Sequence, residues 1–512
     1  MSNKKMDYRD LPKWKQPKVH KDHAPPRTRR EFLAQGFISF AGTAVVPGLL
    51  TSIASRAYGV ECSSSQNGST NLPFVVVDLA GGSNIAYGNV LVGKNGSQSN
   101  FIDDAGAQLL GCPPGQNPLN NPQMVNSELK LLFHTNSAFL AGFKSSTSAD
   151  TRKNMDGVVY AVRSADDSRN NPLNPIFFVN AAGAKGQLVD VAGTGASVAL
   201  GKSIAPATSL STASTVLVER PEDAASIVNP GLMGELLPGQ AEKILKAAES
   251  MSAKRLAAFE AKTLPQQVQD LVNCGYISSV KNLTSLTPET IDPRNDQAVT
   301  TALAMNNIGT DATINPAFAP AEAPGQFVGE QGAAATLAKL VIDGYAGAAT
   351  LELGGYDYHG DGRQAQSIMD FNAGRNAGFF FEIAKLKSKP MVMTFITDGA
   401  VSSRGGNPDP SPEAAGRFSF SSDSGVHSSA FMLVYNPNGV DSTGIRQIGS
   451  FLDGSGSVDQ TTAIGNNIEA FTKAVTLNYL ALKGDEGSFD KVVKGNPFGA
   501  DTSKYISFGK LK

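Results

Sequence analysis

The sequence predicts an α/β fold built around a parallel β-sheet, and three apolar runs carry this prediction. Residues 73–79 form a β-branched run without polar alternation, as expected of a strand buried on both faces. Residues 348–353 and 391–396 are β-rich runs that flank a segment long enough for a helix, which is typical of a parallel βαβ unit. Each run ends in polar residues at the edge where such sheets bind ligands.

The remaining expected elements continue this mixture of strands and helices along the chain. Further strands are expected at residues 137–143, 176–179, 215–218 and 428–435. Helices are expected at residues 125–133, 331–345 and 461–482. Long helical segments at 239–261 and 264–280 indicate a helical insertion, at about 230–325, in a domain that spans residues 73–512. Residues 403–422, rich in Gly, Pro and Ser, are expected to form a long loop over the ligand edge.

The first 57 residues are expected to be an export signal and not part of the fold. Thr28–Leu33 reads TRREFL, a twin-arginine signature, and the apolar run that follows at 37–50 is short and contains glycine. Small residues favour cleavage after Ala57, with residues 58–72 as a linker. We therefore expect the Tat export machinery as a partner, a periplasmic location and no stable membrane span after cleavage. The alternatives are an uncleaved anchor and a lipoprotein attached through Cys62.

Removal of this leader changes the charge of the chain. The leader holds 11 of the 44 Lys and Arg and 4 of the 46 Asp and Glu, which leaves 33 basic and 42 acidic residues, a net charge of about −9. This balance argues against a general nucleic-acid binder, which needs a basic face. The remaining histidines are His134, His359 and His427, and the three cysteines show no zinc-ligand spacing.

Acidic and imidazole side chains stand at, or beside, the ends of the predicted strands. Carboxylates with neutral imidazoles are ligands for divalent cations, and the imidazoles favour Zn²⁺ or Mn²⁺. The predicted metal ligands are Asp78, Asp357, His359, Asp398 and His427. Ser83 is the candidate nucleophile, activated by the same metal. The alternative is that these residues cap loops and helix ends, and His134 is interpreted as a structural histidine.

Several of these motifs occur in an order known from one family. Residues 351–359 (LELGGYDYH) resemble the GG-[WF]-D-T-H motif of the DUF1501 proteins, which are exported members of the alkaline phosphatase-like superfamily. Residues 77–84 (VDLAGGSN) resemble the first strand and Gly-rich turn of that family. Residues 394–403 (TFITDGAVSS) and 422–427 (SDSGVH) stand where the family has T-x-S-E-F-G-R and T-D-H-G. The resemblance covers most of residues 72–497 at the level of motifs.

The resemblance implies a three-layer αβα sandwich of the alkaline phosphatase-like type, with a helical insertion. It also implies an exported metal-dependent hydrolase of phosphate or sulfate esters. The chain departs from the superfamily pattern, with Asp398-Gly399 in place of Asp-His and Asp357-Tyr358-His359 in place of Asp-x-x-x-His. These departures favour one divalent metal over two. The alternative function is a non-catalytic periplasmic or envelope protein, for binding or assembly, on a degenerate scaffold.

Overall fold

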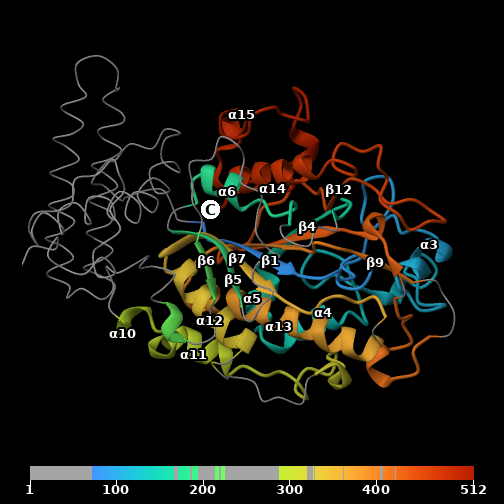
Figure 1. Cartoon of the computed structure of the whole chain (residues 1–512), viewed down its shortest axis with the longest axis horizontal. Helices are drawn as coiled ribbons and strands as arrows, with labels where there is room; N and C mark the ends of the chain where they lie inside the picture. Colours follow the sequence, from blue (N-terminus) through green and yellow to red (C-terminus); the bar gives the residue numbers. More distant parts are fainter. Residues whose placement is uncertain are drawn as a thin grey trace, which may run out of the picture. The chain divides into compact units, whose positions relative to one another are not determined.

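The computed structural model describes residues 72–165, 171–184, 187–193, 214–217, 221–224, 288–319, 327, 329–360, 362–403, 408–420 and 422–512. The predicted export signal, nearly all of the predicted linker and the predicted helices at 239–261 and 264–280 lie outside these residues. The described residues confirm the predicted α/β class, because a mostly parallel sheet lies between helices on both of its faces (Figure 1).

An eight-stranded sheet forms the centre of this part of the chain. Its strands, in spatial order, are β12 (Gln447–Ile448), β4 (Met155–Tyr160), β11 (Ala430–Tyr435), β8 (Met391–Ile396), β1 (Phe74–Leu79), β7 (Ala346–Leu353), β5 (Gln187–Gly193) and β6 (Ser214–Leu217). Seven strands run in one direction and β11 runs against them. The residues that precede β11 therefore lie at the same edge of the sheet as the residues that follow β1, β7 and β8.

The central strands agree closely with the sequence prediction. β1 lies between β7 and β8, and Asp78 is in register with Glu352 on one side and Ile396 on the other. All residues of the three strands are buried, which is why most of their residues are apolar. The predicted strands at 428–435 and 215–218 correspond to β11 and β6. β4 and β5 were not predicted.

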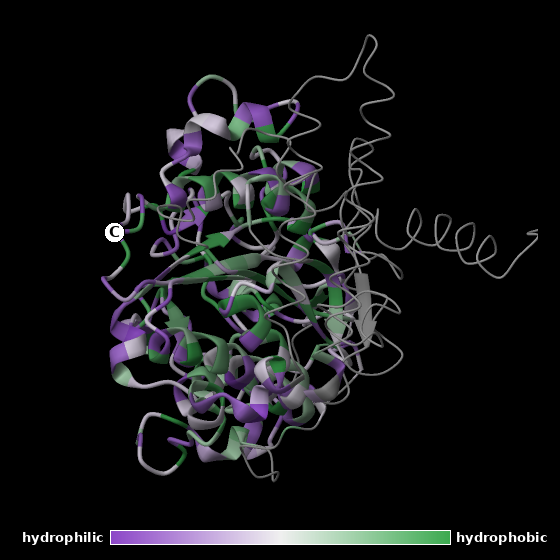
Figure 2. Cartoon of the chain, turned by 90° about the vertical axis from the view of Figure 1, so that its left-hand side faces the viewer, coloured by the Kyte–Doolittle hydropathy of each residue, from purple (hydrophilic) through white to green (hydrophobic). Residues whose placement is uncertain are grey.

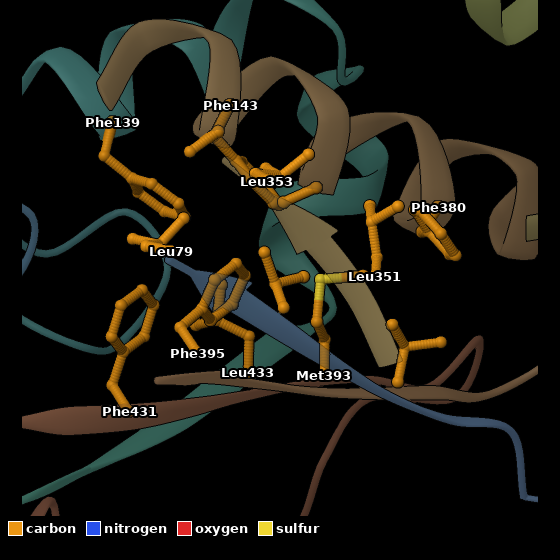
Figure 3. Close-up of a cluster of buried hydrophobic side chains, with 14 of the residues drawn as sticks. Leu79, Phe139, Phe143, Leu351, Leu353, Phe380, Met393, Phe395, Phe431 and Leu433 are labelled. Atoms are coloured by element: carbon orange, nitrogen blue, oxygen red, sulfur yellow. The ribbon is translucent and has the colours of Figure 1, made fainter. Parts of the chain in front are cut away.

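Helices cover both faces of the sheet. On one face, α4 (Ala138–Ser145), α12 (Gly329–Ile342) and α13 (Arg363–Leu386) pack over a core to which β1 contributes Val75, Val77 and Leu79 (Figure 3). On the other face, α6 (Ile176–Ala181) and α14 (Ile468–Lys483) cover a second core, to which β1 contributes Phe74 and Val76. These two cores make the domain an α/β sandwich.

Aromatic rings fill the core under α4 and α13. The rings of Phe395 and Phe431 are stacked with centroids 4.3 Å apart, and Phe139 of α4 meets both of them edge-on (Figure 3). Such arrangements are favoured by the ring quadrupole beyond simple area burial. In Figure 2 the strands of the central sheet are accordingly coloured mostly as hydrophobic.

Helices α4 and α13 approach each other closely at glycines. A Cβ atom added to Gly374 of α13 would lie 1.9 Å from the carbonyl oxygen of Phe139 in α4, and one added to Gly142 of α4 would lie 1.9 Å from that of Phe371 in α13. Both obstructing atoms belong to the backbone, so no side chain can move to make room. The two helices therefore require glycine at this crossing.

Two predicted strands are wrong, because both segments are helices. Residues 137–143 belong to α4, where the Ser137 hydroxyl accepts a hydrogen bond from the amide of Leu140 (3.2 Å). Residues 176–179 belong to α6, where the Asn174 side-chain oxygen accepts one from the amide of Ile176 (3.1 Å). A short apolar run does not distinguish a strand from a buried helix, and only at 137–143 does a capping residue, Ser137, mark the start of the helix.

The predicted helix at 125–133 is also wrong. β2 (Val125–Asn126) and β3 (Phe133–His134) form an antiparallel pair instead. The Asn126 side chain accepts a hydrogen bond from the amide of Glu128 (2.9 Å), and Lys130 has a φ of 60°. Both features belong to a turn, so the segment reverses direction where a helix would continue.

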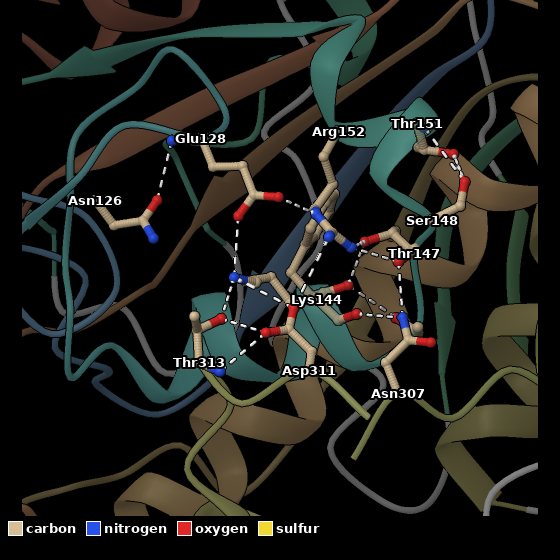
Figure 4. Close-up of polar contacts among 12 residues, drawn as sticks. Asn126, Glu128, Lys144, Thr147, Ser148, Thr151, Arg152, Asn307, Asp311 and Thr313 are labelled. Carbon is tan, nitrogen blue, oxygen red and sulfur yellow. Dashed lines mark hydrogen bonds and ion pairs between the residues drawn. The ribbon is translucent and has the colours of Figure 1, made fainter. Parts of the chain in front are cut away.

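A buried polar network ties this turn to the helices behind it (Figure 4). Glu128 forms ion pairs with Lys144 of α4 (3.0 Å) and with Arg152 of α5 (Ala149–Lys153) (2.5 Å). Lys144 also lies 3.4 Å from Asp311. Because the two cationic side chains are almost fully buried and hydrogen-bonded, these pairs fix the positions of the segments that they join.

Smaller elements complete the described chain. They are α3 (Asp104–Leu109), α10 (Pro288–Ile291), α11 (Gln297–Leu303), α15 (Phe489–Val492) and the short pair β9 (Val401–Ser402) and β10 (Ser422–Asp423). The predicted helices at 331–345 and 461–482 correspond to α12 and α14, although α14 begins only at Ile468, after Asn467 caps it. Within the described ranges, no helix is both long and apolar enough to cross a membrane.

Candidate metal centre

The loops that follow β1, β7 and β8 are joined by hydrogen bonds at the carboxyl edge of the sheet. The amide of Ala80 donates to the carbonyl of Leu353 (2.9 Å), and the amide of Tyr356 donates back to Ala80 (2.9 Å). The Thr397 hydroxyl donates to the carbonyl of Leu79 (2.9 Å) and accepts from the amide of Ser83 (3.0 Å). These contacts hold the three predicted ligand loops against one another.

Gly81 makes the contact between the first two of these loops. Its φ is +127°, and an added Cβ atom would lie 2.7 Å from the amide nitrogen of Asp357. A residue with a side chain would be strained here and would also displace the loop that carries Asp357. The Gly-rich turn after β1 therefore brings the β7 loop close to the sheet.

Two predicted ligands, Asp357 and His359, meet a third acidic residue, Asp423. One ligand atom from each of the three side chains lies within 4.8 Å of the others. The His359 Nδ1 atom contacts the Asp357 carboxylate and lies 3.4 Å from Oδ1 of Asp423. The side chains of Asp357 and His359 are about half exposed and that of Asp423 is more exposed, so a cation and a further small molecule can reach them from solvent.

Local backbone structure explains how these side chains meet. Burial alternates along this loop, because Asp357 and His359 are exposed while Tyr356 and Tyr358 are buried, so the two proposed ligands lie on the solvent side. Asp423 comes from β10, which pairs with β9 so that Asp423 lies opposite Val401. The site thus draws on the loop after β7 and on the segment that leads into β11.

Asp78 lies in the interior, beneath the loops. It is fully buried, and its Oδ1 atom accepts a hydrogen bond from the side chain of Asn171 (2.9 Å), while Oδ2 has no hydrogen-bond partner among the described residues. Burial raises the pKa of this carboxyl group well above its usual value, and the neighbouring carboxylates of Asp398 and Glu352 raise it further.

Asp398 is engaged with the backbone. Its side chain is 6% exposed, and Oδ1 accepts hydrogen bonds from the amides of Gly81 (2.6 Å) and Gly399 (3.0 Å). This carboxylate therefore fixes the Gly-rich turn after β1 to the loop after β8. The contacts match the alternative interpretation of a strand-end carboxylate as a loop cap.

His427 uses both of its ring nitrogens in hydrogen bonds. Nε2 lies 2.8 Å from the carbonyl oxygen of Ser455, and Nδ1 lies 2.6 Å from the Ser424 hydroxyl. A carbonyl oxygen only accepts, so Nε2 carries the proton and Nδ1 accepts from the serine. Burial lowers the pKa of His427, which keeps the ring neutral.

Ser83 is buried below the edge. Its side chain is 1% exposed, and its Oγ atom has no hydrogen-bond partner within the described ranges. In this conformation the hydroxyl group does not face the solvent from which an ester would approach. Of the six predicted site residues, the structure brings Asp357 and His359 together, whereas Asp78, Asp398, His427 and Ser83 lie outside the cluster that these two form.

The donor set of the cluster fits a divalent cation. Two carboxylates and one imidazole are the ligand types of Zn²⁺ and Mn²⁺ sites, and three protein ligands leave coordination positions for water or substrate. Over the described part of the chain, this is the one group of three or more Asp, Glu, His and Cys residues with the spacing of a metal site. Sequence reasoning missed Asp423, although it lies in the SDSGVH motif four residues before His427.

Comparison with known proteins identified no relative of this chain. No protein-family model, no curated protein and no solved structure matches the chain. Fold and site together define an α/β protein with an exposed carboxylate–imidazole cluster at the carboxyl edge of a mostly parallel sheet.

Proposed function

We propose that the chain is an exported hydrolase of phosphate or sulfate esters that uses one divalent cation, Zn²⁺ or Mn²⁺. The observation that carries the proposal is the convergence of Asp357, His359 and Asp423 at the edge of the sheet where α/β proteins bind ligands. The resemblance to the DUF1501 family and its alkaline phosphatase-like relatives supports the same reaction class. A second cation is not part of the proposal.

In this proposal the two carboxylates neutralise the charge of the cation, and His359 determines which cation the site prefers. Asp357 and Asp423 supply hard oxygen donors, and the imidazole favours Zn²⁺ or Mn²⁺ over Mg²⁺. A cation bound there would polarise an ester oxygen and activate a water molecule. Because Ser83 is buried, water is the favoured nucleophile, and the serine remains a predicted nucleophile only for a conformation that exposes it.

The first test is the metal content and turnover of the exported protein. We expect about one Zn²⁺ or Mn²⁺ per chain by elemental analysis, and turnover of p-nitrophenyl phosphate or p-nitrophenyl sulfate. His359→Ala and Asp423→Asn should each lower metal content and turnover at least tenfold, since each removes one of three ligands. Asp490→Asn, which changes an exposed carboxylate on α15, is the matched control and should leave both unchanged. A metal-free wild type without turnover would refute the proposal.

A non-catalytic binding or assembly protein is the second candidate. Three observations favour it. Ser83 is buried, the Asp398 carboxylate accepts hydrogen bonds from backbone amides, and both ring nitrogens of His427 are hydrogen-bonded. Stoichiometric metal with no turnover of either ester would support this candidate. Turnover that disappears in His359→Ala would exclude it.

A further inference from the structure

The loop that carries Asp357 and His359 alternates between residues that face the cluster and residues that face the protein interior. Tyr356 and Tyr358 are 1% and 0% exposed, and their ring centroids are 5.9 Å apart. Tyr358 is bonded through the backbone to both Asp357 and His359, so the position of its buried side chain restricts where the two exposed side chains can lie. Whatever holds Tyr358 therefore also holds the backbone between the two proposed ligands.

Helix α13 holds Tyr358 by three polar contacts. The Tyr358 hydroxyl lies 2.8 Å from Oδ1 of Asp370 and 3.3 Å from the carbonyl oxygen of Gln366. The Gln366 side-chain amide donates to the carbonyl of Tyr358 (3.0 Å). A carbonyl oxygen and a carboxylate oxygen both accept hydrogen bonds, so the Tyr358 hydroxyl is the donor.

Asp370 is in turn fixed by a buried arginine. The Nη2 atom of Arg363 lies 3.5 Å from Oδ2 of Asp370, and its Nη1 atom donates to Oε1 of Gln366 (3.0 Å). The guanidinium group lies 5.3 Å from the centroid of the Phe420 ring. Arg363 and Asp370 are at most 1% exposed, so these contacts are shielded from water.

We propose that Tyr358, Gln366 and Asp370 are positioning residues that pre-organise Asp357 and His359 to bind a divalent cation. The inference rests on the proposed function, since it assigns these residues to the same site. Without the Tyr358–Asp370 hydrogen bond, the ligand loop would have to be ordered when the cation binds, and that ordering lowers affinity. Tyr358 is thus an interior residue whose effect appears at the surface site.

The test compares Tyr358→Phe with Tyr479→Phe in the purified exported protein. Both tyrosines are completely buried and both substitutions remove a hydroxyl group that is hydrogen-bonded, but the Tyr479 hydroxyl donates to the carbonyl of Leu72 (2.9 Å), on the other face of the sheet. We expect Tyr358→Phe to weaken Co²⁺ and Zn²⁺ binding about ten- to a hundredfold, as for other residues that orient metal ligands. Tyr479→Phe should leave both affinities unchanged.

A second measurement separates positioning from general stability. Asp370→Asn keeps an oxygen that accepts from the Tyr358 hydroxyl, whereas Asp370→Ala removes it. The visible absorption of bound Co²⁺, which reports ligand geometry, should be wild-type in Asp370→Asn and changed in Tyr358→Phe and Asp370→Ala. Equal Co²⁺ affinity and spectra in wild type and Tyr358→Phe would overturn this inference and leave the proposed function intact. A wild type that binds neither Co²⁺ nor Zn²⁺ would overturn both.

Discussion

His134 shows how the surroundings of a buried side chain determine its chemistry. Its Nε2 atom lies 3.0 Å from the carbonyl oxygen of Gln116, and Nδ1 accepts from the amide of Asn136 (3.1 Å). Both nitrogens are therefore satisfied by the neutral ring, with the proton on Nε2. Burial, with a contribution from nearby Arg417, lowers the pKa of His134 to about 4. The contacts agree with its interpretation as a structural histidine.

The low pKa of His134 predicts that the folded protein loses stability in acid. In the unfolded chain a histidine binds a proton below about pH 6.5, whereas folded His134 does so only below about pH 4. Its stabilising contribution is therefore present above pH 6.5 and is lost as the pH falls towards 4, a change of about 3 kcal/mol. We expect His134→Gln to reduce the difference between the unfolding free energies at pH 7 and pH 4.5. Urea denaturation at both values measures it, and an unchanged difference would contradict the assignment.

Asp423 shows what a sequence leaves open at the level of single residues. Asp357 and His359 were predictable because they follow a strongly apolar strand and stand two residues apart. Asp423 lies among Ser and Gly residues, where an acidic residue is ordinary, and it reaches the cluster only through the pairing of β10 with β9. That pairing joins two-residue strands, which are too short to produce a periodic pattern.

At the level of elements, the crossing of α4 and α13 is the most constrained contact described above. Gly374→Ala would place a methyl group 1.9 Å from a backbone oxygen of α4, so the helices would have to separate. We expect the unfolding free energy to fall by about 3 kcal/mol. Gly487→Ala is the matched control, since an added Cβ atom there has nothing within 4 Å, and it should change stability by less than about 0.5 kcal/mol. Chemical denaturation compares the two, and equal effects would refute the prediction.

The elements divide into those that the sequence predicts and those that it does not. β1, β7 and β8 were predictable because strands buried on both faces require long apolar, β-rich runs. α4 and α6 were not, because each is short and buried along most of its length, so no polar stripe marks the helical period. Edge strand β12, two residues long, left no pattern at all.

At the level of the whole molecule, the twin-arginine motif of the predicted export signal gives a testable prediction of where the protein acts. Replacing Arg29 and Arg30 by lysine should leave most of the protein in the cytoplasm, because the Tat pathway recognises the arginine pair. Arg27→Lys is the matched control and should be exported like the wild type. Cell fractionation with immunoblotting measures the periplasmic share. Equal export of the double variant and the wild type would contradict the prediction.

The reversed direction of β11 has a consequence for how this protein can evolve. Asp357 and His359 lie on a segment that leaves the sheet, whereas Asp423 lies on one that enters it. A change in the length or sequence of the segment that precedes β11 can therefore replace the third proposed ligand, Asp423. The helices that connect the parallel strands need not change. Related chains would then be expected to differ most in the donor contributed by this segment, and least in the pair that follows β7.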